Sequence, residues 1–176
     1  MSGLPSDGSA EVKRRSREWA LLALRLVVGF GFAAHGYAKL DRGPEKFAAI
    51  LQAMGIPAPG VMAWATTLLE LLGGVSVMLG AFVAPLSLPL VVIMLTAMLG
   101  VHLPYGFSSV RLQAIAPAGA VFGPVGYELN LLYIAALVAL AFGGASPLSV
   151  DRWRASRALE CTSTPSSTTR PWTRSR

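Results

Sequence analysis

The sequence contains little charge for its length. Only 14% of its 176 residues are Asp, Glu, Lys or Arg, whereas 53% are hydrophobic, and the mean hydropathy is +0.56. Soluble globular domains usually carry about 25% charged residues. The composition therefore excludes an ordinary soluble domain and predicts a membrane protein.

Cysteine and histidine are also scarce. The one cysteine, Cys161, excludes an internal disulfide and a dithiol redox mechanism within this chain. The two histidines belong to no H-x-x-E-H or E-x-x-H pattern, so we predict no metal site. The formal net charge of +6 comes from tails and membrane flanks rather than from a basic helix face, which argues against a nucleic-acid partner.

Long hydrophobic runs are what the sequence does contain. Four of them approach the length of about 20 residues that crosses a bilayer. Small residues in the first two runs, such as Gly29, Gly36 and Gly74, favour close helix packing in lipid. We therefore predict an all-α fold, a four-helix transmembrane bundle. The predicted spans are Trp19–Ala38, Val61–Leu79, Pro85–Val101 and Tyr127–Phe142.

Positive charges around the spans predict their orientation. Seven Lys or Arg residues flank the ends on the side of the termini, and four lie in the opposite loops. Because positive loops stay in the cytoplasm, both termini are expected there. The first span is too long for a signal peptide and lacks a clear cleavage site, which favours an uncleaved anchor.

The two ends of the chain lack periodic apolar patterns. We expect residues 1–18 and 156–176 to be disordered cytoplasmic tails, which leaves residues 19–155 as the folded transmembrane domain. Between spans one and two, Pro44, Phe47, Ile50 and Leu51 have helical spacing, so a short interfacial helix is expected there. The apolar, Pro- and Gly-rich loop 102–126 is a candidate for a lid over the outer end of the bundle.

Counting about 1.5 Å of rise per residue places the polar residues by depth. Glu70 falls near the midplane, and three other side chains reach the outer half of the same bundle. A carboxylate at mid-bilayer is costly, which points to a partner or a function. Glu70 either locks the helices, protonated or paired with Arg25 or a histidine, or it transfers protons and binds a polar head such as a quinone carbonyl. The other three outer-half residues are His35, His102 and Glu128.

The remaining polar residues also have two interpretations. His35 and His102 stand at span ends, where an imidazole can simply meet headgroups and water. Arg25 is close enough to the inner surface to snorkel toward it. Glu128 and Asn130 begin span four, and Glu128 suits a helix N-terminus.

Taken in order, five segments resemble the DoxX family of small bacterial membrane proteins, over roughly residues 20–155. They are "LRLVVGFGFAAHGYAKL" (24–40), "FAAILQAMGIP" (47–57), "LLELLGGVSVMLGAF" (68–82), "HLPYGF" (102–107) and "GYELNLL" (126–132).

The resemblance implies a four-helix fold in the bacterial cytoplasmic (inner) membrane. It also implies matching polar positions, namely Arg25, His35, Lys39, Glu70, His102 and Glu128. Relatives include membrane subunits of thiosulfate:quinone oxidoreductases and members associated with a superoxide dismutase and a sulfurtransferase.

Two function hypotheses follow from the resemblance and the residues together. In the first, the chain is the quinone-binding subunit of a membrane oxidoreductase, in which Glu70 and His35 handle protons and Arg25, Lys39, His102, Glu128 and Asn130 form a polar cluster around the quinone. In the second, it is a non-catalytic scaffold that recruits soluble redox enzymes. The expected partners are membrane lipid and a soluble or membrane redox subunit, with a second copy of the chain as a further candidate.

Overall fold

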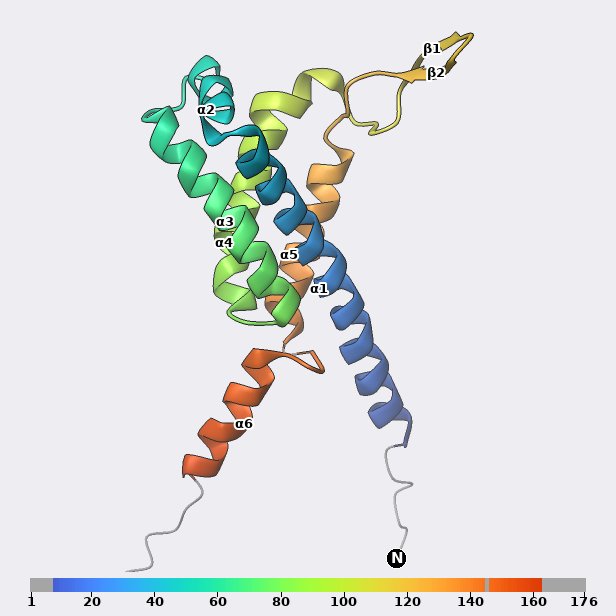
Figure 1. Cartoon of the computed structure of the whole chain (residues 1–176). Helices are drawn as coiled ribbons and strands as arrows, with labels where there is room; N and C mark the ends of the chain where they lie inside the picture. Colours follow the sequence, from blue (N-terminus) through green and yellow to red (C-terminus); the bar gives the residue numbers. More distant parts are fainter. Residues whose placement is uncertain (1–7, 145, 163–176) are drawn as a thin grey trace, which may run out of the picture.

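The computed structural model describes residues 8–144 and 146–162, and it is dominated by helices (Figure 1). The α-helices are α1 (Gly8–Arg42), α2 (Pro44–Ala53), α3 (Pro59–Leu79), α4 (Val83–Ala97), α5 (Glu128–Gly143) and α6 (Val150–Thr162). A π-helical turn (Met98–His102) and a 3-10 turn (Leu103–Tyr105) prolong α4. The two strands, β1 (Leu112–Ala116) and β2 (Gly119–Phe122), form an antiparallel hairpin.

Three helices are long and apolar enough to cross a membrane: Gly8–Arg42, Pro59–Leu79 and Val83–Tyr105. The fourth apolar helix, α5, is shorter. These four helices run side by side in alternating directions (Figure 1). The prediction of an all-α, multi-pass membrane bundle is therefore confirmed. We call the end of the bundle beside α6 the terminal end, and the end beside α2 and the hairpin the loop end.

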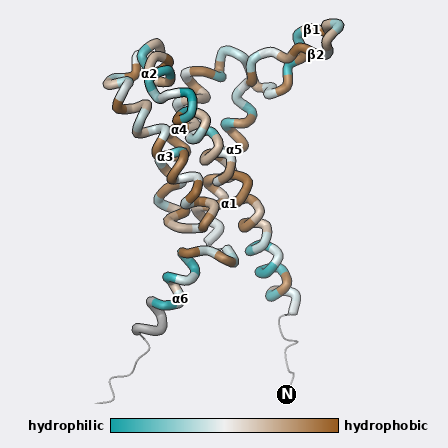
Figure 2. Tube along the Cα trace, in the orientation of Figure 1, coloured by the Kyte–Doolittle hydropathy of each residue, from teal (hydrophilic) through white to brown (hydrophobic). Residues whose placement is uncertain are grey.

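The core lies in the middle of the bundle, where Phe32, Val77, Leu90 and Leu137 are buried. Phe32 also packs edge-to-face against Tyr133, with ring centroids 5.4 Å apart. Colouring by hydropathy shows mostly apolar residues in the bundle and hydrophilic ones on its terminal arms (Figure 2). This distribution fits a bundle with lipid around its middle.

Helices α1 and α3 approach each other through small residues. A Cβ on Gly36 would overlap the backbone of Leu71, and one on Gly74 would overlap that of Ala33. The backbones therefore touch at two levels, which larger side chains would prevent. This contact sets the position of the polar pair described below.

Replacing Gly74 with Leu is expected to destabilise the bundle by about 3 kcal/mol or more, because the new side chain has no space beside Ala33. Thermal unfolding of the detergent-solubilised chain would measure this loss. Gly60→Ala is the matched control, since nothing lies within 4 Å of a Cβ at that position of the same helix. Equal melting temperatures for the two variants would contradict the proposed contact.

The helices extend into both ends of the chain. Residues 8–18 belong to α1, and residues 156–162 belong to α6, whereas both segments were expected to be disordered. Salt bridges account for part of the order: Glu18 contacts Arg14 at 3.9 Å on its own helix and Arg152 of α6 at 3.0 Å. The rest of the predicted tails, residues 1–7 and 163–176, lies outside the described residues.

The structure confirms one prediction about the segments between the spans and contradicts another. The short helix predicted after span one is confirmed as α2, with Pro44 in its first turn. The loop 102–126 instead contains the β1–β2 hairpin, which extends sideways from the bundle rather than folding over it (Figure 1). The expected lid is therefore wrong.

Candidate functional site

The clearest candidate site is an ion pair between α1 and α3. The ammonium nitrogen of Lys39 lies 2.6 Å from both carboxylate oxygens of Glu70. Glu70 is only 2% exposed, whereas the Lys39 side chain keeps 23% of its surface exposed. The carboxylate is thus closed off, whereas part of the Lys39 side chain stays accessible.

The close contact of α1 with α3 makes this pair. Gly36 sits against Leu71, the residue that follows Glu70. Lys39 lies three residues after Gly36, so it is on nearly the same side of α1, one turn nearer the loop end. Its long side chain therefore turns back along α3 to Glu70.

The third element of the site is α2. The Lys39 ammonium lies 4.4 Å from the centroid of the Phe47 ring, a distance typical of a cation–π contact. A tight connection between α1 and α2 brings Phe47 close to Lys39. Gly43, with φ 89°, is its one residue, and Pro44 begins α2 directly after it. The sequence pattern assigned Phe47 only to the helical spacing of α2. Its position in the first turn of the helix that follows Lys39 could have indicated this contact.

The electrostatics favour a charged pair. A lone carboxylate in this surrounding would be expensive, whereas a partner with two short hydrogen bonds offsets much of that cost. Chemically, the pair combines a charged N–H donor, Lys39, with a carboxylate that offsets its positive charge.

His35 lies beside this pair but not within it. It is four residues before Lys39, hence one turn away along the same side of α1, and its side chain is exposed. Among the hydrogen bonds of the described residues, none involves His35. The structure therefore leaves its imidazole open to the surroundings next to the accessible edge of the pair.

His102 and Glu128 do not join the pair either; they hold the long loop. His102 donates from Nδ1 to the carbonyl oxygen of Val125 at 2.9 Å, and Glu128 accepts from the backbone N–H of Ser109 at 3.0 Å. Both contacts connect the end of the α4 extension to the start of α5. Depth counting placed these residues at the loop end, but their partners belong to the base of the hairpin.

Asn130 is buried within the bundle and links α5 to α4. Its side-chain amide donates to the carbonyl oxygen of Met94 at 3.3 Å. Met94 lies one turn before the π-helical segment of α4. This is a helix-to-helix contact without a direct connection to Glu70.

Arg25 forms a second polar cluster at the terminal end, far along α1 from Lys39. It is 3% exposed and donates to the Ser146 hydroxyl at 2.6 Å and to the Leu148 carbonyl at 3.2 Å. Its Nε has no partner among the described residues. A cavity of about 140 Å³ adjoins it, lined by α1, α4, α5 and residues 146, 149 and 151. Arg25 thus fastens the segment after α5 to the bundle rather than pairing with Glu70.

Asp151, which sequence analysis missed, belongs to this second cluster. Its two carboxylate oxygens accept from the backbone N–H groups of Phe82 and Val83 at 3.0 and 3.1 Å. Asp151 therefore satisfies free N–H groups at the start of α4 from a helix nearly 70 residues away. An acidic residue in the first turn of α6 was the only signal in the sequence, and it gave no indication of this target.

The described residues contain no group of three or more His, Cys, Asp or Glu side chains that could hold a metal ion.

Comparison with known families gave one match. The family model DoxX matches residues 20–103, which include α1 from its midpoint, α2, α3, α4 and the whole Lys39–Glu70–Phe47 site. No curated protein and no solved structure matched the chain.

Proposed function

This chain is a DoxX-family membrane protein, matched over residues 20–103, and from that premise we propose that it serves as the quinone-binding membrane subunit of a redox complex. The complex is of the thiosulfate:quinone oxidoreductase type, in the bacterial cytoplasmic membrane, with both termini of this chain in the cytoplasm. The observation that supports the proposal best is the Lys39–Glu70 pair, in which Glu70 is buried and the Lys39 side chain is partly exposed.

The residues present suit a quinone head group. Such a group has a flat ring and two carbonyl oxygens that accept hydrogen bonds. Lys39 offers a donor on its exposed side, the Phe47 ring lies 4.4 Å away as a flat neighbour, and His35 provides a second polar group one turn along α1. A lipid-soluble molecule would reach this edge from the surrounding membrane.

Each residue has a stated role in the proposal. Quinone supplies the chemistry of accepting electrons and protons when it is bound. Lys39 orients a carbonyl by a hydrogen bond and delivers a proton from Nζ, and Glu70 keeps Lys39 charged between turnovers. Water at the loop end, to which Lys39 lies closer than His35 does, replaces the proton on Nζ, and the exposed His35 offers a second hydrogen bond to the quinone one turn deeper along α1. The electrons come from a partner subunit.

His35→Ala should raise the KM for quinone by about tenfold while leaving the fold intact, because one hydrogen bond is lost from an exposed position. The assay is quinone reduction by the complex purified through a tag on this chain. Tyr37→Leu is the control, since Tyr37 is 62% exposed and points to another side of the same helix. An unchanged KM in the His35 variant would remove His35 from the proposed site.

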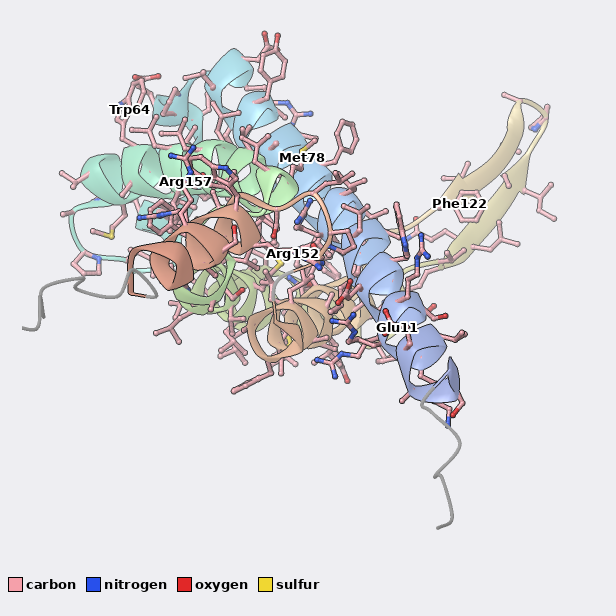
Figure 3. The ribbon with its side chains drawn as sticks, turned by 90° about the horizontal axis from the view of Figure 1, so that it is seen from below. Glu11, Trp64, Met78, Phe122, Arg152 and Arg157 are labelled. Carbon is pink, nitrogen blue, oxygen red and sulfur yellow. The ribbon has the colours of Figure 1, made fainter. Side chains whose placement is uncertain are left out.

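A second candidate function is a scaffold for soluble redox enzymes. The N-terminal part of α1 and the whole of α6 extend beyond the bundle at the same end (Figure 1), and Figure 3 shows Arg152 and Arg157 on α6 with Glu11 on α1. Residues 8–17 of α1 and 152–157 of α6 are exposed, and each stretch contains three arginines. Such arms offer a charged surface to a soluble partner with acidic groups.

If the scaffold function holds, purification from native membranes in mild detergent should recover a soluble protein in a stoichiometric amount. Reversing charge on the arms with Arg154→Glu and Arg157→Glu should lower that recovery at least fivefold, because the complementary charges would then repel. Arg42→Glu combined with Lys46→Glu, both exposed at the loop end, changes the net charge by the same amount and is the control. Equal recovery with all variants would exclude the arms as the docking surface.

A further inference from the structure

The β1–β2 hairpin presents an uncovered apolar face. In its register Leu112 pairs with Phe122 and Ile115 with Ala120, while Ala114 pairs with Val121 between them. Ala120 and Phe122 are two residues apart on β2 and share one face. Their partners Ile115 and Leu112 lie on that same face because the register shift between Leu112 and Ala114 adds one residue to β1. They are 56%, 83% and 58% exposed, so no described residue covers them.

The hairpin projects sideways from the loop end, away from the bundle axis (Figure 1). It projects to one side in the view of Figure 1, and Figure 3, turned by 90°, also places Phe122 well to the side of the helices. At its base Phe107 and Tyr127 pack edge-to-face, with centroids 5.6 Å apart. Aromatic residues at the end of membrane helices mark the level of the lipid headgroups.

The apolar surface is continuous from the bundle to the hairpin. Leu99 and Leu103 at the end of the α4 extension are 60% and 48% exposed, followed by Phe107 at 56% and Val110 at 72%. Lipid covers Leu99 in a helix that crosses the membrane, and the exposed apolar side chains continue from there without interruption. Between Leu103 and Tyr127 the sequence has a single charged residue, Arg111.

We propose that the face formed by Leu112, Ile115 and Phe122 lies in the lipid surface of the membrane at the loop end. The hairpin rests at the boundary between headgroups and acyl chains, because a two-stranded sheet leaves edge N–H and C=O groups that need water. Arg111 is the one charged residue between Leu103 and Tyr127, so the segment lacks the basic cluster that would select anionic lipid, and the lipid surface we propose is zwitterionic. The hairpin thereby anchors the loop end laterally, outside the helical bundle.

Fluorescent labelling of single cysteines tests this placement. In the full chain with Cys161→Ser, Ile115→Cys and Ala114→Cys are adjacent positions on opposite faces of β1, and both side chains are exposed. Each variant is labelled with an environment-sensitive dye and reconstituted into phosphatidylcholine vesicles. The dye at 115 should be quenched by nitroxide-bearing lipid at least threefold more than the dye at 114, and aqueous iodide should show the reverse preference.

A third labelled position tests whether the result at position 115 is a local effect of that substitution. Phe122→Cys lies on the same face as Ile115, so it should follow the pattern of position 115. Equal iodide quenching at 114, 115 and 122 would overturn the proposal, as would protection of 115 from both quenchers, which would indicate a second copy or a protein partner on this face.

Discussion

Glu70→Gln is expected to lower quinone-dependent turnover of the purified complex by at least 100-fold. The substitution keeps the shape of the side chain and an oxygen that can accept from Lys39, but it removes the negative charge. Without that charge Lys39 loses its ion-pair partner and the contact that positions its Nζ, and acid–base participation of the proposed kind usually contributes 10²- to 10⁴-fold. Turnover of the complex with a short-chain benzoquinone would measure the loss.

Glu45→Gln provides the matched control for this experiment. It removes the same charge from α2, a few residues from Phe47, but its side chain is exposed. Its turnover should stay within twofold of the native complex. If Glu70→Gln inserts, folds and retains native turnover and quinone affinity, the catalytic hypothesis is rejected and the pair is a structural lock.

The helices of this protein could be predicted from the sequence because their signals are local. An apolar run of sufficient length needs no information from elsewhere to indicate a span, and the spacing of Phe47, Ile50 and Leu51 sufficed for α2. The ends of α1 and α6 were misjudged because part of their support comes from contacts distant in sequence, such as Glu18 with Arg152.

The composition of the candidate site was harder to predict than its depth. Counting residues along each span placed His35, Glu70, His102 and Glu128 toward one end, but it ignored the direction of each side chain around its helix. His102 and Glu128 bond to the loop instead, and the partner of Glu70 is Lys39. The relation between Gly36 and Lys39, three residues apart, was the available signal, because a glycine that faces α3 places the next turn toward α3 as well.

Lys39→Met is expected to lower the free energy of unfolding by about 3 kcal/mol, since it leaves the Glu70 carboxylate buried without its partner. Adding Glu70→Gln to Lys39→Met should recover part of this loss, because an amide is less costly to bury than a lone charge. A double-mutant cycle in detergent, measured by reversible unfolding, should therefore give a coupling of at least about 1 kcal/mol.

The pair Arg152–Glu18 calibrates this coupling. It has a similar separation of 3.0 Å, but its side chains are 48% and 22% exposed, so water screens it and its coupling should stay below about 1 kcal/mol. A Lys39–Glu70 coupling no larger than that of Arg152–Glu18 would mean that burial adds nothing to the pair. Strong coupling together with native turnover in Glu70→Gln would assign the pair to stability alone, whereas strong coupling with lost turnover would indicate that the same contact holds the helices and positions the proton.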